Sequence, residues 1–309
     1  MAGPGGGYHP FPLHNLYRIV HKLGHGSYST IWLLRQGYDP YNLSFRIQGP
    51  YGTHACNVTS PARMSFSDAT EGSYVRLFRL EVARALAAHL AIAVEYIHAQ
   101  RFVHGDLHCG NILLCLPLRI DRFSDEELYQ KYGGPQSEAI QRFDGKKLPP
   151  CIPSHGILPI WLGKASESLG LPESKALLSD FGEACSPIKE DRQPLSFPSD
   201  IWSIVCTIWA IIAQRPLFEG FLASEDDMTC EHVDVLGILP PEWWTKWDAR
   251  GNKFSDNGTP INRDSYRSLK DRFEDSRDAL FSMLKLMLSF GPENRPSAKD
   301  MLASEWITK

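Results

Sequence analysis

The sequence predicts an α+β protein, with a small strand-rich N-terminal part and a larger, mainly helical C-terminal part. Three observations support this prediction. The chain has 309 residues, a length that usually divides into two domains or lobes. Short β-branched and aromatic segments fill the chain up to about residue 60. From residue 80 onward, apolar residues recur at helical spacing.

Composition and charge exclude several classes of protein. Apolar residues make up 43% and charged residues 22%, as in soluble globular domains. The net charge of −4 argues against a dedicated nucleic-acid binder, so we expect no direct contact with nucleic acid. The seven cysteines include no CxxC pair, which argues against a disulfide framework and fits a reducing compartment.

The N-terminus and the apolar stretches indicate where the chain is expected to work. The first residues have neither the basic nor the apolar region of a signal peptide. The longest apolar stretch, residues 201–213, is shorter than the roughly 20 residues that span a bilayer. We therefore expect no membrane contact, and a monomer in the cytoplasm, the nucleus or both.

The N-terminal part is predicted to be a Gly- and Pro-rich flexible arm, residues 1–15, followed by a small lobe, residues 16–66. Its core pattern is strand, glycine turn, strand, with the turn at Gly24-His-Gly26-Ser-Tyr-Ser29. Four short strands are predicted, at residues 17–23, 30–34, 45–47 and 54–59.

The C-terminal part, residues 67–309, is predicted to be mainly helical. Its clearest helix covers 73–98, where apolar residues alternate in steps of three and four. Residues 117–175 lack any sustained period and are expected to be an insertion with one short helix, and 221–260 is expected to be loop-rich. Two short strands are predicted at 111–114 and 176–179, and three further helices at 201–213, 278–290 and 298–306.

Three motifs carry chemistry. The loop His104-Gly-Asp106-Leu-His108-Cys-Gly-Asn111 offers a carboxylate that can orient a hydroxyl and an amide oxygen that can hold a divalent cation. Asp180-Phe-Gly182 places a second carboxylate before a glycine hinge, which suits Mg²⁺ bridging two phosphates. In the glycine turn, backbone N–H groups can approach phosphate oxygens. In this order along the chain, the set is far more specific than any one motif.

In this combination the chain resembles the protein-kinase superfamily, and in finer detail the SR-protein kinases, especially fungal SR-protein-kinase-like sequences. The resemblance covers most of residues 16–309, including the stretches Tyr17–Trp32, Leu177–Ala184 and Pro198–Ser203, Glu293-Asn-Arg-Pro296, and Trp306. It implies a bilobal kinase-like fold and a Ser/Thr protein kinase that uses ATP and Mg²⁺. It also implies Arg-Ser-rich splicing factors as protein substrates.

The resemblance also implies roles for individual residues. Asp106 would be the catalytic base, His108 would stand where most protein kinases carry a Lys beside the γ-phosphate, and Asn111 and Asp180 would bind Mg²⁺. Asp200 would brace the catalytic loop from below. The nucleotide would be held by residues of the small lobe: Gly24, Gly26 and Ser27 over the phosphates, and the segment Val58 to Ser60 near the adenine.

Beside His108, one further position of this loop departs from the family and another matches it. Gly105 replaces the usual Arg, so control through a phosphorylated activation loop is not expected. His104 is expected to be a structural histidine beneath the loop.

Two blocks of the family pattern are missing. Between Lys22 and Lys131 there is no lysine, so the third-strand Lys and the helix Glu that pairs with it are absent. Only 17 residues separate Gly182 from Asp200, and they contain no Ala-Pro-Glu, which leaves Arg295 without its family partner. The flanking motifs are intact, which favours segments missing from the gene model of an active kinase over drift in a dead enzyme. For the chain as written, we predict weak or no phosphoryl transfer, since losing one preorganised contact costs about 10²–10³ in rate.

Other interpretations stay open. The missing Lys and Glu would also fit a pseudokinase that holds Arg-Ser peptides without turnover. The loop text His-Gly-Asp-Leu-His-x-Gly-Asn also occurs in small-molecule phosphotransferases of the aminoglycoside and choline kinase type. The acidic clusters at 125–127 and 225–227 are interpreted as solvated faces in preference to docking surfaces for Arg-rich peptides. A zinc site at His104, His108 and Cys109 is disfavoured, because no further ligand pair is evident.

Overall fold

The computed structural model divides into two compact units, each described here by itself. Unit 1 comprises residues 1–63 and 116–163, and unit 2 comprises 64–115 and 164–309. The sequence analysis assigned 117–175 to the larger lobe, whereas the contacts group 116–163 with the N-terminal residues. The structure describes residues 12–13, 17–26, 29–36, 44–49, 52–117, 120–150, 152–187, 195–213, 215–220, 222–262 and 278–309.

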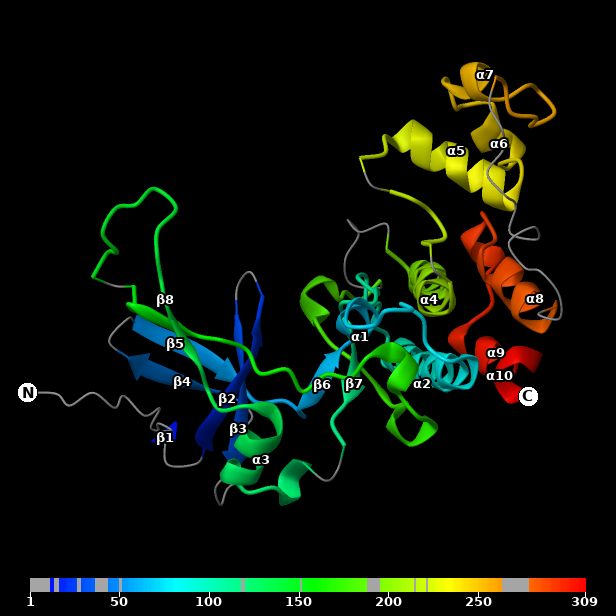
Figure 1. Cartoon of the computed structure of the whole chain (residues 1–309). Coiled ribbons are helices and arrows are strands. Elements are labelled where there is room, and N and C mark those ends of the chain that lie inside the picture. The colour runs from blue at the N-terminus through cyan, green and yellow to red at the C-terminus, as the bar shows by residue number, and fades with distance from the viewer. Residues whose placement is uncertain are drawn as a thin grey trace, which may run out of the picture. The chain divides into compact units, whose positions relative to one another are not determined.

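Unit 1 is built from short antiparallel strands and one helix (Figure 1). Its sheet has the order β1-β2-β3, and two separate hairpins pair β4 with β5 and β8 with β9. The strands are β1 (Pro12–Leu13), β2 (Tyr17–His25), β3 (Thr30–Gln36), β4 (Ser44–Gly49), β5 (Gly52–Asn57), β8 (Ser137–Ala139) and β9 (His155–Ile157). The helix is α3 (Asp125–Tyr132), which follows the 3-10 turn η1 (Ile120–Arg122). In the described part of the chain between β3 and β6 there is no helix.

The four predicted N-terminal strands correspond to β2, β3, β4 and β5. Of the predicted flexible arm, Pro12–Leu13 forms β1 and pairs with Tyr17 and Arg18 of β2. The other residues of 1–15 lie outside the described residues.

Unit 2 combines a three-stranded sheet of order β10-β7-β6 with a group of helices. The strands are β6 (Ala62–Ser65), β7 (Ile112–Cys115) and β10 (Ala176–Leu178). The helices are α1 (Phe66–Glu71), α2 (Leu80–Ala99), α4 (Phe197–Ile212), α5 (Glu225–Leu236), α6 (Pro241–Trp244), α7 (Arg250–Lys253), α8 (Asp278–Met287), α9 (Ala298–Leu302) and α10 (Glu305–Thr308). The described part of this unit also contains the 3-10 turns η2 (Ser166–Ser168), η3 (Leu171–Glu173), η4 (Phe181–Glu183) and η6 (Pro292–Asn294).

Helices α2 and α4 form the centre of the core of unit 2. Most apolar positions of α2 at helical spacing, among them Ala83, Leu90 and Val94, are at most 1% exposed, whereas Ile97 is 9% and Leu80 is 37% exposed. They pack with α4, α8, α9 and α10 in one hydrophobic cluster. Because α4 is apolar on most of its surface, it is buried along its length, as the sequence indicates.

Several predicted boundaries were wrong. Helix α2 begins at Leu80 and not at residue 73, since Arg79 is extended. The loop-rich interpretation of 221–260 overlooked α5, whose start is marked by a capping box between Ser224 and Asp227. The single helix predicted at 298–306 is two short helices, with Ser304 as the N-cap of the second. Within the described residues, no helix combines the length and apolar character needed to cross a bilayer.

Candidate active site

The loop that carries Asp106 is fixed to helix α4 by one buried carboxylate. Asp200, 1% exposed, accepts hydrogen bonds from the backbone N–H groups of His104 (2.8 Å) and Gly105 (2.9 Å). His98, at the end of α2, donates its Nε2 to the same carboxylate at 2.8 Å. Three donors from two segments therefore converge on Asp200, as the predicted bracing role requires.

His104 connects this loop to the segment that precedes Asp180. Its ring is fully buried, and Nε2 lies 3.0 Å from the carbonyl oxygen of Ser179. A carbonyl only accepts, so Nε2 carries the proton and Nδ1 is left to accept from the N–H of Asp106 at 3.4 Å. The ring also packs against Phe181, with 4.8 Å between centroids. Both ring nitrogens are thus used within the protein, which fits the structural role and leaves neither for zinc.

Asp106 and Asn111 are in direct contact. The Asn111 side-chain amide donates both to the backbone oxygen of Asp106 (3.0 Å) and to its Oδ2 (2.9 Å). His108 Nε2 lies 3.7 Å from the same Oδ2, and both side chains are about half exposed. The amide N–H₂ of Asn111 is thereby committed to Asp106, which leaves Oδ1 of Asn111 to face other partners.

Pairing of β7 with β10 brings Asp180 to this loop. Ile112 is opposite Leu178, and the carbonyl of Asn111 accepts from the Ser179 N–H (2.9 Å) and hydroxyl (2.8 Å). Asp180 follows directly, in a left-handed conformation with φ of 58°, and caps η4. Its carboxylate is exposed and accepts a long hydrogen bond, 3.4 Å, from the N–H of Gly182.

The residues present fit a Mg²⁺ ion. Mg²⁺ prefers oxygen ligands, usually one or two carboxylates together with phosphate oxygens and water. Asp180 offers an exposed carboxylate, and Asn111 offers an amide oxygen on the residue whose backbone contacts Ser179. In the described part of the chain, no group of three or more His, Cys, Asp or Glu is arranged to hold a metal. A site here would therefore need the phosphates of a nucleotide as further ligands.

The predicted nucleotide-binding residues lie in unit 1. Gly24 is opposite Ile31 in the β2–β3 hairpin, and the N–H of Gly26 donates to the carbonyl of Ser29 at 2.9 Å, closing the turn. A Cβ at Gly24 would meet no atom within 4 Å. Ser27 lies outside the described residues.

The other predicted nucleotide-binding residues follow β5. Val58 is half-buried and Ser60 is exposed, in the irregular segment before β6. The structure thus groups Asp106, His108, Asn111 and Asp180 in unit 2, and the remaining predicted residues in unit 1.

Two positions where the chain departs from the kinase pattern have a physical explanation. Gly105 has φ of 82°, and a Cβ there would lie 3.0 Å from the Glu183 carbonyl oxygen, so a side chain at this position is strained. Arg295 donates to the carbonyls of Ser289 (2.8 Å) and Pro198 (2.9 Å) and stacks on Trp202 at 4.8 Å. Backbone carbonyls and an aromatic ring therefore take the place of the absent glutamate, and burial lowers the pKa of Arg295.

One cysteine, Cys109, lies within the loop that carries Asp106. Burial raises the pKa of the Cys109 thiol to about 11, so the thiol is neutral near pH 7. This cysteine is therefore poorly suited to act as a nucleophile.

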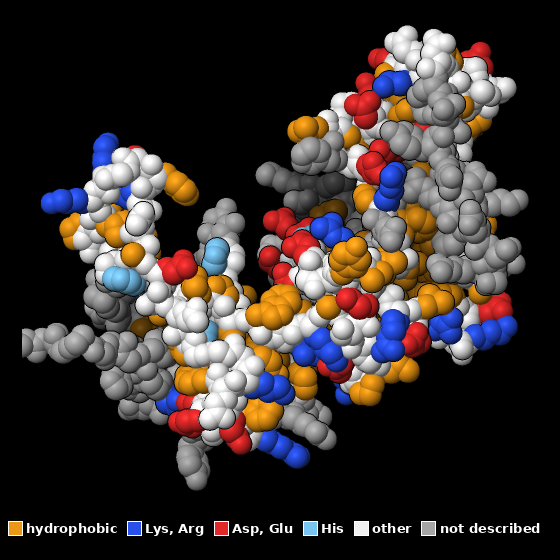
Figure 2. All heavy atoms as spheres, in the orientation of Figure 1, with side chains coloured by type: hydrophobic (Ala, Val, Ile, Leu, Met, Phe, Trp, Pro, Cys, Tyr) orange, Lys and Arg blue, Asp and Glu red, His pale blue; other side chains and the backbone are white. Residues whose placement is uncertain are grey.

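The two acidic clusters are the first turns of helices. Ser224 and Asp227 form a capping box, Asp227 pairs with Lys253 at 3.0 Å, and Asp226 accepts from Trp247 Nε1 at 2.7 Å. In the other cluster, Glu127 completes a capping box with Ser124. On the face that Figure 2 shows, acidic and basic side chains of the described residues are interspersed. Several carboxylates of these clusters are therefore already engaged in helix capping or in contacts with other side chains of the protein.

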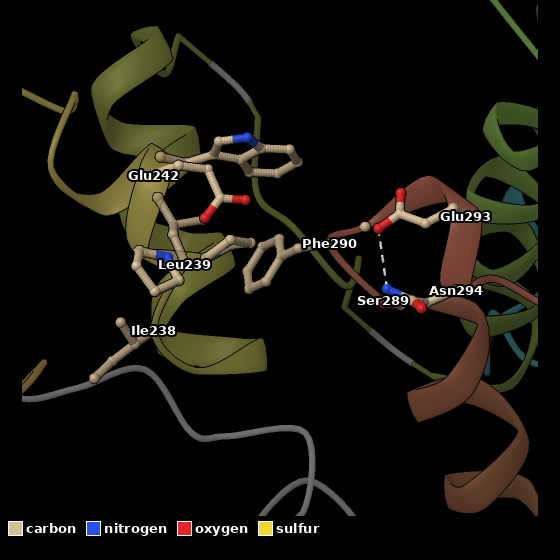
Figure 3. Close-up of a pocket in the computed structure, with 11 residues that line it drawn as sticks. Ile238, Leu239, Glu242, Ser289, Phe290, Glu293 and Asn294 are labelled. Carbon is tan, nitrogen blue, oxygen red and sulfur yellow. Dashed lines mark hydrogen bonds between the residues drawn. The ribbon is translucent and has the colours of Figure 1, made fainter.

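A pocket of about 600 Å³ in unit 2 contains none of the predicted site residues. It is lined by residues 238–243 and by the segment after α8 that includes Phe290 and Glu293 (Figure 3). Asn294 donates to Glu293 at 3.1 Å on one side. Trp243 meets Phe290 edge to face, with 6.4 Å between centroids.

The loop brings a carboxylate and an amide together, next to the strand pair that Asp180 follows, and phosphoryl-transfer sites use groups of these kinds. No family model matches the chain.

Curated proteins with similar sequences are Ser/Thr protein kinases. The serine/threonine-protein kinase SRPK of Physarum polycephalum is 23% identical, over 98% of this chain and 89% of its own length. The serine/threonine-protein kinase AFC1 of Arabidopsis thaliana is 24% identical over 84% of this chain, which spans only 56% of that relative. A serine/threonine protein kinase of Aspergillus fumigatus is 21% identical over 94% of this chain and 84% of its own length.

These similarities support a protein kinase of the Ser/Thr type with a relationship to SRPK, and the α+β architecture agrees with this. The alignment with SRPK covers 395 positions, more than the 309 residues of the chain. The relative therefore has residues with no counterpart here, as expected if blocks of the kinase pattern are missing.

Proposed function

We propose that the chain is a phosphotransferase of the SR-protein kinase type, which transfers the ATP γ-phosphate to Ser in Arg-Ser-rich proteins. The observation that carries the proposal is the contact between Asp106 and Asn111, together with the β7–β10 pairing that places Asp180 next to Asn111 in space. The similarity to SRPK supports the substrate class.

In this proposal, the four predicted site residues of unit 2 divide the chemistry among them. Asp106 orients the serine hydroxyl and accepts its proton, while the amide of Asn111 holds Oδ2 of Asp106 in place. Asn111 Oδ1 and the Asp180 carboxylate would hold Mg²⁺, which when bound neutralises phosphate charge. His108 would donate to the transferred phosphoryl group from beside Asp106. Gly24, Gly26 and Ser27 would cover the phosphates, and Val58 and Ser60 would lie near the adenine.

The absence of a third-strand Lys sets the expected level of activity. Without that contact to the α- and β-phosphates, transfer should be slower by at least about 10²–10³ than in a complete kinase. The missing Lys also gives specific support to a second candidate, a pseudokinase that binds Arg-Ser peptides without turnover.

The test is transfer of labelled γ-phosphate from Mg-ATP to an Arg-Ser peptide. Asp106→Asn should abolish the signal, and Asp256→Asn, which changes a 99% exposed carboxylate in the same unit, should not. Equal signal from the Asp106→Asn variant and the parent chain removes Asp106 from its role. Peptide binding with no signal and no Mg-ATP thermal shift favours the pseudokinase. Phosphorylation of a soluble amino alcohol or sugar instead favours a small-molecule phosphotransferase.

A further inference from the structure

Within unit 1, one carboxylate of the inserted segment joins the two strands of the glycine hairpin. Asp125, in the first turn of α3, accepts from Arg18 on β2 and from Nε of Arg35 on β3, the latter at 2.6 Å. The Asp125 side chain is only 13% exposed. Asp125 is 90 residues beyond Arg35 in the sequence, so the contact joins distant parts of the chain.

The two arginines that Asp125 joins are direct cross-strand partners. The register of β2 and β3 sets Arg18 opposite Arg35. Like charges directly opposite each other destabilise an antiparallel pair. A single carboxylate between two opposed guanidinium groups therefore replaces a repulsion with two charge-assisted hydrogen bonds.

Further polar contacts fix the same segment to the hairpin. Arg35 also donates to the carbonyl of Phe123, just before α3. The Tyr129 hydroxyl donates to the carbonyl of Val20 at 2.9 Å. On the far side of the insertion, the N–H of Ile160 donates to the carbonyl of Lys22 at 2.8 Å.

Apolar side chains complete the contact. A separate hydrophobic cluster of unit 1 combines the β2–β3 residues Val20 and Leu33 with buried residues of the insertion, namely Ile120, Leu128, Ile160 and Leu162. A few isolated strands are only marginally stable without a helix or second sheet against their apolar face. In the described part of unit 1, α3 is the helix that supplies this cover.

We propose that residues 116–163 supply the cover that the β2–β3 hairpin needs, and that Asp125 is the residue that positions this glycine hairpin. The insertion is then an integral part of the small lobe, since it closes the core beneath the strands that carry Gly24 and Gly26. The expectation that Asp125 affects nucleotide binding rests on the proposed function, whereas the expectation that Asp125 keeps β2 and β3 ordered does not.

Hydrogen–deuterium exchange of the full chain tests the positioning role. Asp125→Asn should speed exchange of the β2 and β3 amides by about tenfold or more, because Asn keeps one accepting oxygen for two arginines and carries no negative charge between them. The matched control is Glu126→Gln, an exposed neighbour in the same helical turn, which should leave exchange unchanged. Equal exchange in the two variants overturns the proposal.

A double variant separates charge neutralisation from a general loss of packing. Arg18→Gln with Asp125→Asn removes one of the opposed charges, so β2 and β3 should regain much of their protection. Exchange as fast as in Asp125→Asn alone overturns the neutralising role. Should Asp125→Asn fail to fold, the double variant compared with Glu126→Gln carries the same test.

Binding measurements give a readout that a merely structural role would not move. Asp125→Asn should raise the Kd for Mg-ATP several-fold and leave the affinity for an Arg-Ser peptide unchanged. Loss of both affinities to the same degree contradicts a specific positioning role. If the parent chain binds no nucleotide, the proposed function fails, while the exchange experiment still decides the role of Asp125.

Discussion

Replacing Asp200 tests how the catalytic loop is held, because its carboxylate is buried and fully used. Asp200→Asn keeps the shape but leaves one accepting oxygen for three donors, from His104, Gly105 and His98. At least one buried donor then loses its partner, at a cost of about 1–3 kcal/mol. Asp200→Ala leaves both backbone N–H groups without an acceptor, for which the same estimate gives about 2–6 kcal/mol.

These losses are large compared with a total free energy of unfolding of about 5–15 kcal/mol. They are measured by urea denaturation followed by tryptophan fluorescence. Six of the eight tryptophans lie in unit 2, so the signal mainly reports the unit that contains Asp200. The order of midpoints should be parent chain, Asp200→Asn, then Asp200→Ala.

The matched control is Asp256→Asn, the same chemical change at a side chain that is 99% exposed. Its midpoint should lie close to that of the parent chain, since exposed ion pairs contribute little. If Asp200→Asn and Asp256→Asn have the same midpoint, the carboxylate does not hold the loop and the geometric argument for the site is wrong.

Three further outcomes are expected. Gly105→Arg, which introduces the usual kinase residue, should lower the melting temperature, because φ is 82° and a backbone oxygen would lie 3.0 Å from the new Cβ. The control is Gly251→Ala, whose Cβ would meet no atom within 4 Å, and its melting temperature should stay that of the parent chain. Alkylation of Cys109, followed by mass spectrometry, should keep accelerating from pH 8 to 10, because its pKa is about 11; a plateau near pH 9 would contradict this. The hydrogen bond from Arg18 lowers the pKa of Asp125, so the ionised carboxylate stabilises β2 and β3 fully above pH 3.8, the ordinary pKa of Asp, and loses this effect as the pH falls further. Exchange of the β2 and β3 amides should therefore speed up in acid in the parent chain, and Asp125→Asn should remove this dependence on pH.

Local signals in the sequence were sufficient for the catalytic loop. The spacing of Asp106 and Asn111 predicted one loop after a long helix, and the two side chains are hydrogen-bonded. The acid at Asp200 was expected to brace that loop, and its contacts with His104 and Gly105 agree. These features depend on short motifs whose residue types leave few conformations.

Two predictions failed because the overall composition of a segment was given more weight than individual residues within it. The stretch 221–260 is polar and contains Gly and Pro, yet Ser224 and Asp227 form a capping box that starts α5. The acidic residues at 125–127 were interpreted as a solvated face, since a run of charges carries no information on its partners. Arg18 and Arg35 lie about a hundred residues away, so the sequence alone could not show the pairing with Asp125.

Residue type and spacing carry information locally, and they were enough to predict the motifs, the helical core of unit 2 and the absence of a third-strand lysine. Only the folded chain showed that the insertion belongs with the N-terminal strands, because apolar burial and charge pairing are satisfied by whichever segments meet in space. An acidic residue near the middle of an apparent insertion thereby lies between two opposed arginines, and proximity along the chain gave no indication of it.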